Sequence, residues 1–101
     1  MPSAGDMRAW DAEIRGARVR IGVEAETRVT DLQALLRRIA LKARDSGVDR
    51  VLLLLAETRT NRAFVREFHD VLASDYPVAG RVALAELAAG HDPGGNAVVM
   101  L

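Results

Sequence analysis

The run Val51–Leu55 limits the fold of this chain more than any other segment, because all of its residues are apolar. A short run of this kind, rich in Val and Leu, is typical of a β-strand that is buried on both faces. Such a strand needs helices packed on both sides of its sheet. The sequence therefore predicts an α/β layered domain with a central strand at 51–55.

Two segments near the start of the chain, Trp10–Ile14 and Val19–Ala25, alternate in the two-residue period of a half-buried strand. A tight turn over 15–18 joins them into a hairpin, which places Asp11 opposite Gly22 and Glu13 opposite Arg20. One face is then apolar, with Trp10, Ala12, Ile14, Val19, Ile21, Val23 and Ala25. The other face carries Asp11, Glu13, Arg18, Arg20, Gly22, Glu24 and Glu26.

The rest of the chain reads mainly as helices. Thr30 or Asp31 caps a first helix that ends at Gly47. Its inward residues are Leu32, Leu35, Leu36, Ile39 and Ala43, and its polar face carries Gln33, Arg37 and Arg44. A second helix runs from Thr60 or Asn61 to Tyr76–Pro77, and a short helix follows over 81–89. After a turn at 91–96, a last strand at 97–101 completes a mixed sheet with the order β-β-α-β-α-α-β.

Length and composition limit the class of protein. The 101 residues suffice for one domain, assigned to 9–101 after a flexible lead-in at 1–8. Equal numbers of acidic and basic residues, 14 of each, exclude a strongly basic nucleic-acid coat but permit a local patch. The absence of Cys excludes disulfides and thiolate chemistry. No membrane span or export signal is apparent, so we expect a cytoplasmic location and no membrane partner.

The candidate functional site consists of three carboxylates on the polar face of the hairpin: Asp11, Glu24 and Glu26. In the predicted register Asp11 and Glu24 are diagonal neighbours whose side chains can converge. Two carboxylates plus a phosphate can hold a magnesium ion, and Gly22 leaves space for it. The alternative is an ordinary solvated face, and alternation alone favours that interpretation.

The order of these residues resembles a nuclease core. An Asp at the head of one strand, Val23-Glu24-Ala25-Glu26-Thr27 at the end of the next and a following helix are similar to the PD-(D/E)xK superfamily, which has a restriction-endonuclease-like fold. The resemblance implies that Asp11 and Glu24 bind magnesium and that Glu26 and Gln33 complete the catalytic set. Glu26 stands where most members have Lys, so Arg28 or Arg37 is the candidate for the missing positive charge. The first helix and strand of that core would be absent.

A second resemblance covers nearly the whole chain. Four segments are similar to the C-terminal region of actinobacterial helix-turn-helix (XRE-type) transcriptional regulators: 8–11, 23–28, 31–35 and 44–49. This likeness implies DNA as a partner, reached directly or through a helix-turn-helix domain. Arg28, Arg37 and Arg44 are then candidate phosphate contacts.

Three functions remain open on these grounds. The first is a nuclease-like, catalytically degenerate accessory or regulatory domain of a DNA-associated protein. The second is an active magnesium-dependent DNA endonuclease that uses Asp11, Glu24 and Glu26. The third is a structural dimerisation module with solvated carboxylates, and the sheet edge left by a missing first strand favours a homodimer.

A further charged group lies on the second helix. Its basic members are Arg59, Arg62 and Arg66, and its acidic neighbours are Glu57, Glu67 and Asp70. Because the two signs are interspersed, the sequence favours a solvated face held by salt bridges over a basic edge.

Overall fold

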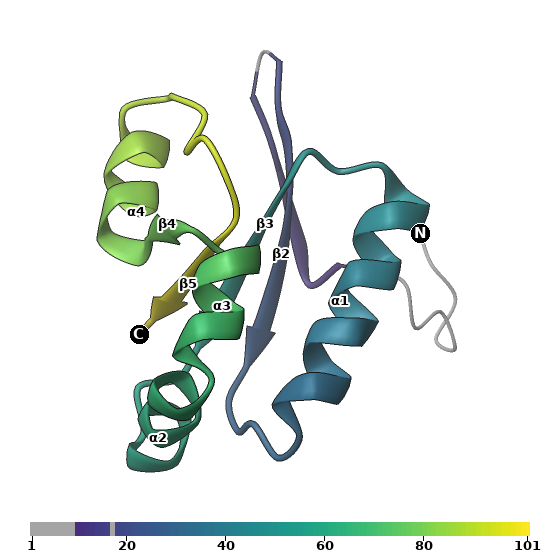
Figure 1. The fold of residues 1–101 in the computed structure, drawn as a ribbon. Coiled ribbons are helices and arrows are strands. Elements are labelled where there is room, and N and C mark those ends of the chain that lie inside the picture. Colours follow the sequence, from purple (N-terminus) through teal and green to yellow (C-terminus); the bar gives the residue numbers. More distant parts are fainter. Residues whose placement is uncertain (1–9, 17) are drawn as a thin grey trace.

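The computed structural model describes residues 10–16 and 18–101, and within them it has a five-stranded mixed sheet flanked by helices (Figure 1). The strands are β1 (Ala12–Arg15), β2 (Arg20–Glu26), β3 (Arg50–Leu55), β4 (Val78–Ala79) and β5 (Ala97–Met100). The helices are α1 (Leu32–Ser46), α2 (Arg59–Glu67), α3 (His69–Asp75) and α4 (Gly80–Ala88). The predicted α/β class is confirmed, while the predicted lead-in at 1–8 lies outside the described residues.

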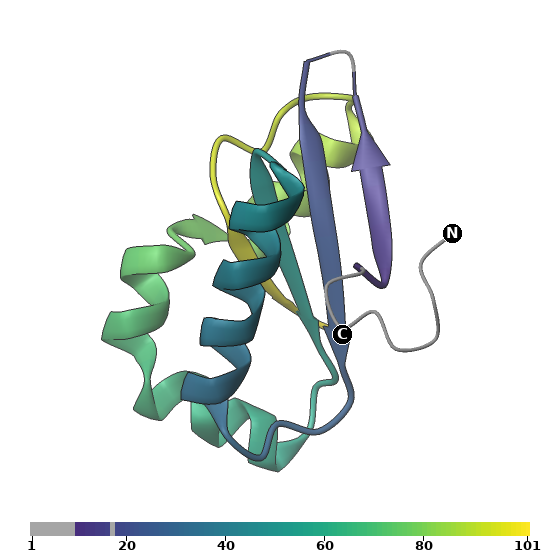
Figure 2. The same cartoon turned by 90° about the vertical axis from the view of Figure 1, so that its right-hand side faces the viewer.

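The strand order is β1-β2-β3-β5-β4, with β1 antiparallel to β2 and every other pairing parallel. Helices α1, α2 and α3 lie on one side of the sheet and α4 on the other (Figures 1 and 2). As the apolar run predicts, β3 is buried on both faces. Val51, Leu53 and Leu55 pack beneath α1, whereas Leu52 faces α4.

Two predicted elements differ from the structure. The single helix expected from residue 60 to 76 is broken at Phe68, whose φ of −102° and ψ of 26° depart from helical values. The break redirects the chain, so that both Phe68 and Leu72 pack against the core under α1. Strand β4 was not predicted, because its two residues are defined only by their pairing with β5. In the described part of the chain, no helix has the length and apolar character needed to cross a bilayer.

The hairpin forms, but its predicted register is wrong. Glu13 lies opposite Gly22 and Arg15 opposite Arg20, because the turn spans 16–19 and not 15–18. The turn is closed by the Gly16 N–H, which donates to the Val19 carbonyl at 2.8 Å. A shift of two residues keeps every strand side chain on its predicted face. The expected ion pair between Glu13 and Arg20 therefore forms along a diagonal, at 2.7 Å.

The prediction of which face is buried is wrong in part. Helix α1 covers the face that carries Gly22 and Glu24, because β2 is an interior strand and its crossover to β3 passes over that face. Trp10 precedes β1 and lies on this same side, where a Cβ at Gly22 would overlap its indole ring. On the other face Ile21 and Val23 are buried, but Ile14 is 39% exposed.

The ion pair at Glu13 gives a first testable prediction. Arg20, through its hydrogen bond, and then Arg15 hold the pKa of Glu13 below its ordinary value of 4.5. We expect Arg20→Gln to raise that pKa towards 4.5, and Arg15→Gln to raise it less, as followed by NMR titration of the side-chain carboxyl. Because the folded pKa is lowered, the stabilising contribution exists above the unfolded pKa and is lost as the pH falls through the folded pKa. An unchanged pKa in Arg20→Gln would show that the pair does not persist in solution.

Candidate functional site

The three predicted carboxylates lie at or near the carboxyl end of β2. Asp11 precedes β1 and its Oδ2 accepts a hydrogen bond from the Ala25 N–H at 2.8 Å, across the hairpin. Glu24 and Glu26 project from β2 towards α1, where each meets a basic side chain. The three residues therefore lie in one region of the hairpin, but among the described residues no group of three acidic or histidine side chains is arranged to hold a metal ion, and α1 lies over Glu24.

Glu24 forms a buried ion pair with Lys42. The Lys42 Nζ lies 2.9 Å from both carboxylate oxygens of Glu24. The two residues are only 4% and 6% exposed. Lys42 reaches this place because it stands three residues after Ile39 and seven after Leu35, on the inward face of α1.

Trp10 covers this pair from the side of the hairpin. Its indole N–H donates to the Ser46 Oγ at 2.9 Å, and the Ser46 hydroxyl donates to the Lys42 carbonyl at 2.6 Å. The Lys42 Nζ lies 5.7 Å from the centroid of the indole ring, a cation–π distance. Gly22 is needed beneath the ring because no larger residue leaves room for it.

A second cation extends the network towards the surface. Arg38 Nη2 lies 2.8 Å from Glu26 Oε1 and 3.9 Å from Glu24 Oε2. Acidic and basic groups thus alternate from Glu26 through Arg38 and Glu24 to Lys42. Only the Glu24–Lys42 end of this network is buried; the Arg38 side chain is 43% exposed, so its ion pairs are screened by water and contribute less.

Sequence reasoning missed both of these cations. The predicted source of positive charge near Glu24 was Arg28 or Arg37. In the structure, Lys42 and Arg38 supply this charge. A signal was present, because Lys42 is the only Lys of the chain and occupies an apolar helix position. A cation at such a position requires an acidic partner across the interface.

The other predicted residues of α1 lie away from the carboxylates. Gln33 is exposed and stands nine residues before Lys42, about 2.5 helical turns, so that it projects from the opposite side of α1. Arg37 is also exposed, and Arg44 pairs with Asp45 at 3.4 Å. Arg28 is exposed in the loop after β2. Gln33 is thus not brought to the carboxylates.

The negative charge of Glu24 also affects the pKa of another residue, Tyr76. Burial raises the pKa of Tyr76, and the negative charges of Asp75 and Glu24 raise it further. Tyr76 directly follows α3, which lies on the same side of the sheet as α1.

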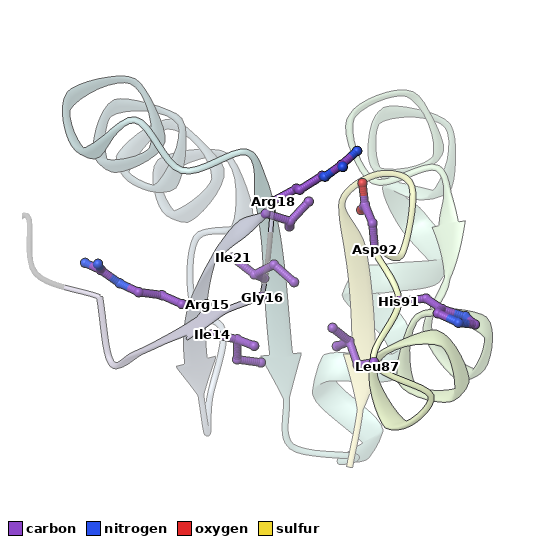
Figure 3. Close-up of a pocket in the computed structure, with 10 residues that line it drawn as sticks. Ile14, Arg15, Gly16, Arg18, Ile21, Leu87, His91 and Asp92 are labelled. Carbon is purple, nitrogen blue, oxygen red and sulfur yellow. The ribbon is translucent and has the colours of Figure 1, made fainter.

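An apolar cavity of about 390 Å³ lies elsewhere, between the tip of the hairpin and the end of α4. Figure 3 shows that Ile14, Ile21 and Leu87 point into it, while Arg15 points away. These side chains belong to the α4 side of the sheet, opposite to Glu24. The cavity and the carboxylates are therefore separate features.

Comparisons of this chain with protein-family models, with curated proteins and with solved structures found no match.

Proposed function

We propose that this chain is a nuclease-like, catalytically inactive domain with an accessory or regulatory role in a DNA-associated protein of the transcriptional-regulator type. Three features support a likeness to the restriction-endonuclease fold. The strands β1 and β2 form an antiparallel hairpin, α1 follows them, and β3 then pairs parallel to β2. The proposed absence of catalysis rests on one observation: both carboxylate oxygens of Glu24 accept hydrogen bonds from Lys42.

The residues at the proposed metal position do not fit a magnesium ion in this arrangement. Magnesium needs oxygen ligands at about 2.0–2.1 Å in octahedral geometry. Both oxygens of Glu24 already accept hydrogen bonds from the Lys42 ammonium. An ion could replace that ammonium only by leaving a buried Lys without its partner, which costs about 3–5 kcal/mol.

The two remaining carboxylates are engaged as well. Asp11 accepts the Ala25 N–H, and Glu26 is held by Arg38. A metal ion at any of the three carboxylates would therefore compete with an internal hydrogen-bond donor. What remains of the domain is a rigid scaffold, suited to association with DNA or with a helix-turn-helix domain.

The test combines a cleavage assay with a binding assay. With magnesium or manganese, we expect no nicking of supercoiled DNA. We also expect no change in the fluorescence of Trp10, the only Trp of the chain, which stacks beside Lys42. The Lys42→Gln variant should acquire a magnesium-dependent rise in its thermal midpoint, since Glu24 is then released. A matched Lys42→Gln, Glu24→Gln double variant should show no such rise.

One outcome overturns the proposal. Magnesium-dependent nicking by the unmodified chain, abolished by both Asp11→Ala and Glu24→Ala, would establish an active endonuclease. Nicking that survives both substitutions would point to a contaminating enzyme, so the two variants are needed together.

A further inference from the structure

Three arginines of α2 form a row on the outer surface of the helix: Arg59, Arg62 and Arg66. Their spacing of three and four residues places them on one helical face, and all three are exposed. In the described part of the chain, none of them has an ion pair or a side-chain hydrogen bond. The salt bridges favoured by the sequence are therefore not formed by these three arginines: Glu57, Glu67 and Asp70 are close to them in sequence, but they are exposed and do not pair with them.

A fourth exposed arginine, Arg28, lies at the same end of the sheet as this row. Asn61 of α2 binds the backbone on both sides of it, because its Oδ1 accepts from the Val29 N–H and its Nδ2 donates to the Thr27 carbonyl, each at 3.0 Å. Asn61 is fully buried, so the loop after β2 is fixed to α2. Figures 1 and 2 both place this loop and α2 at the same end of the sheet.

We propose that Arg28, Arg59, Arg62 and Arg66 form a contact surface for the phosphate backbone of a nucleic acid. The guanidinium group binds phosphate through two parallel hydrogen bonds. The row from Arg59 to Arg66 extends about 10 Å, close to three steps of a nucleic-acid strand at about 3.4 Å each. A linear array of unpaired cations matches a linear polyanion.

A membrane surface fits this row less well. Binding to a lipid surface needs apolar side chains that enter the headgroup region next to the charges. Between the arginines the outward position of α2 holds only Ala63. The inference rests on the proposed association with DNA but not on the proposed loss of catalysis, since none of the four arginines bonds to Asp11, Glu24 or Glu26.

The experiment measures binding of the full chain to a fluorescein-labelled DNA duplex by anisotropy, between 50 and 200 mM salt. Four phosphate contacts give a log–log salt slope of about −3.6, so that affinity falls by about a hundredfold over this range. The Arg59→Gln, Arg62→Gln double variant should have a slope of about −1.8 and lose only about tenfold. The matched control, Arg18→Gln with Arg81→Gln, removes two exposed arginines elsewhere and should behave as the unmodified chain.

Three results would overturn the inference. The first is no binding to the duplex at 50 mM salt. The second is an equal loss of slope in the row variant and in the control, which would indicate only a general charge effect. The third is binding to phosphatidylserine vesicles in place of the duplex. Thermal melts establish that both variants are folded, as expected for exposed side chains without internal contacts.

Discussion

The Lys42→Met variant is expected to lose about 3–5 kcal/mol of its free energy of unfolding. The substitution keeps the length and volume of the side chain but leaves the Glu24 carboxylate buried without the ammonium that bonds both of its oxygens. A buried charge that loses its main partner costs far more than a missing contact, and only Arg38, at 3.9 Å, then remains near Glu24. For a domain of this size, a loss of 3 kcal/mol lowers the thermal midpoint by about 12–24 °C.

The measurement is urea denaturation followed by far-UV circular dichroism. The informative control is a double variant, Glu24→Leu with Lys42→Met, because replacing a whole buried pair by apolar residues is often neutral or stabilising. We expect the double variant to recover most of the loss. A single variant that loses less than about 1 kcal/mol would mean that the pair is hydrated in solution, since exposed pairs contribute no more than this.

The second large effect is expected for Asn61→Ala, with a loss of about 4 kcal/mol. The Asn61 side chain is 0% exposed and satisfies the Val29 N–H and the carbonyls of Thr27 and Ala56. Each buried backbone group left without a partner costs about 1–3 kcal/mol. Partial entry of water reduces the sum of these terms, but three groups in one place make the position unusually sensitive.

Denaturation of Asn61→Ala is to be compared with that of Thr60→Ala, an exposed neighbour for which we expect a change within about 0.5 kcal/mol. Hydrogen exchange gives a second measurement, because the Val29 amide should lose its protection before the amides of β3. If Val29 remains as protected as in the unmodified chain, the role assigned to Asn61 is wrong.

Much of the fold could be predicted because it follows from local physics. Asp31 caps α1 by accepting the Ala34 N–H at 3.0 Å, and Gly47 ends that helix with a φ of 70°, as their residue types indicate. The central strand follows from the apolar run at 51–55. Strand β4 and the break at Phe68 could not be predicted in this way, because both depend on partners distant in sequence.

The candidate site was predictable only in part. Alternation correctly put Glu24 and Glu26 on one face of β2, since a register shift of two residues does not alter the face. The alternation could not show that α1 covers this face, because a two-residue period identifies a strand but gives no information about which element packs against it. The position of Lys42 on the apolar side of α1 was the one sequence signal that an acidic residue must be buried opposite.

The order of strands also governs when this sheet can be completed. Among the strands in the described residues, β5 is the last in sequence, yet it lies between β3 and β4 and alone pairs with β4. During synthesis on the ribosome, the apolar edge of β3 therefore stays open until residues 97–100 emerge. An open apolar edge is a template for pairing with other chains. We therefore expect chains halted before residue 97 to aggregate more readily than chains in which β5 has paired with β3.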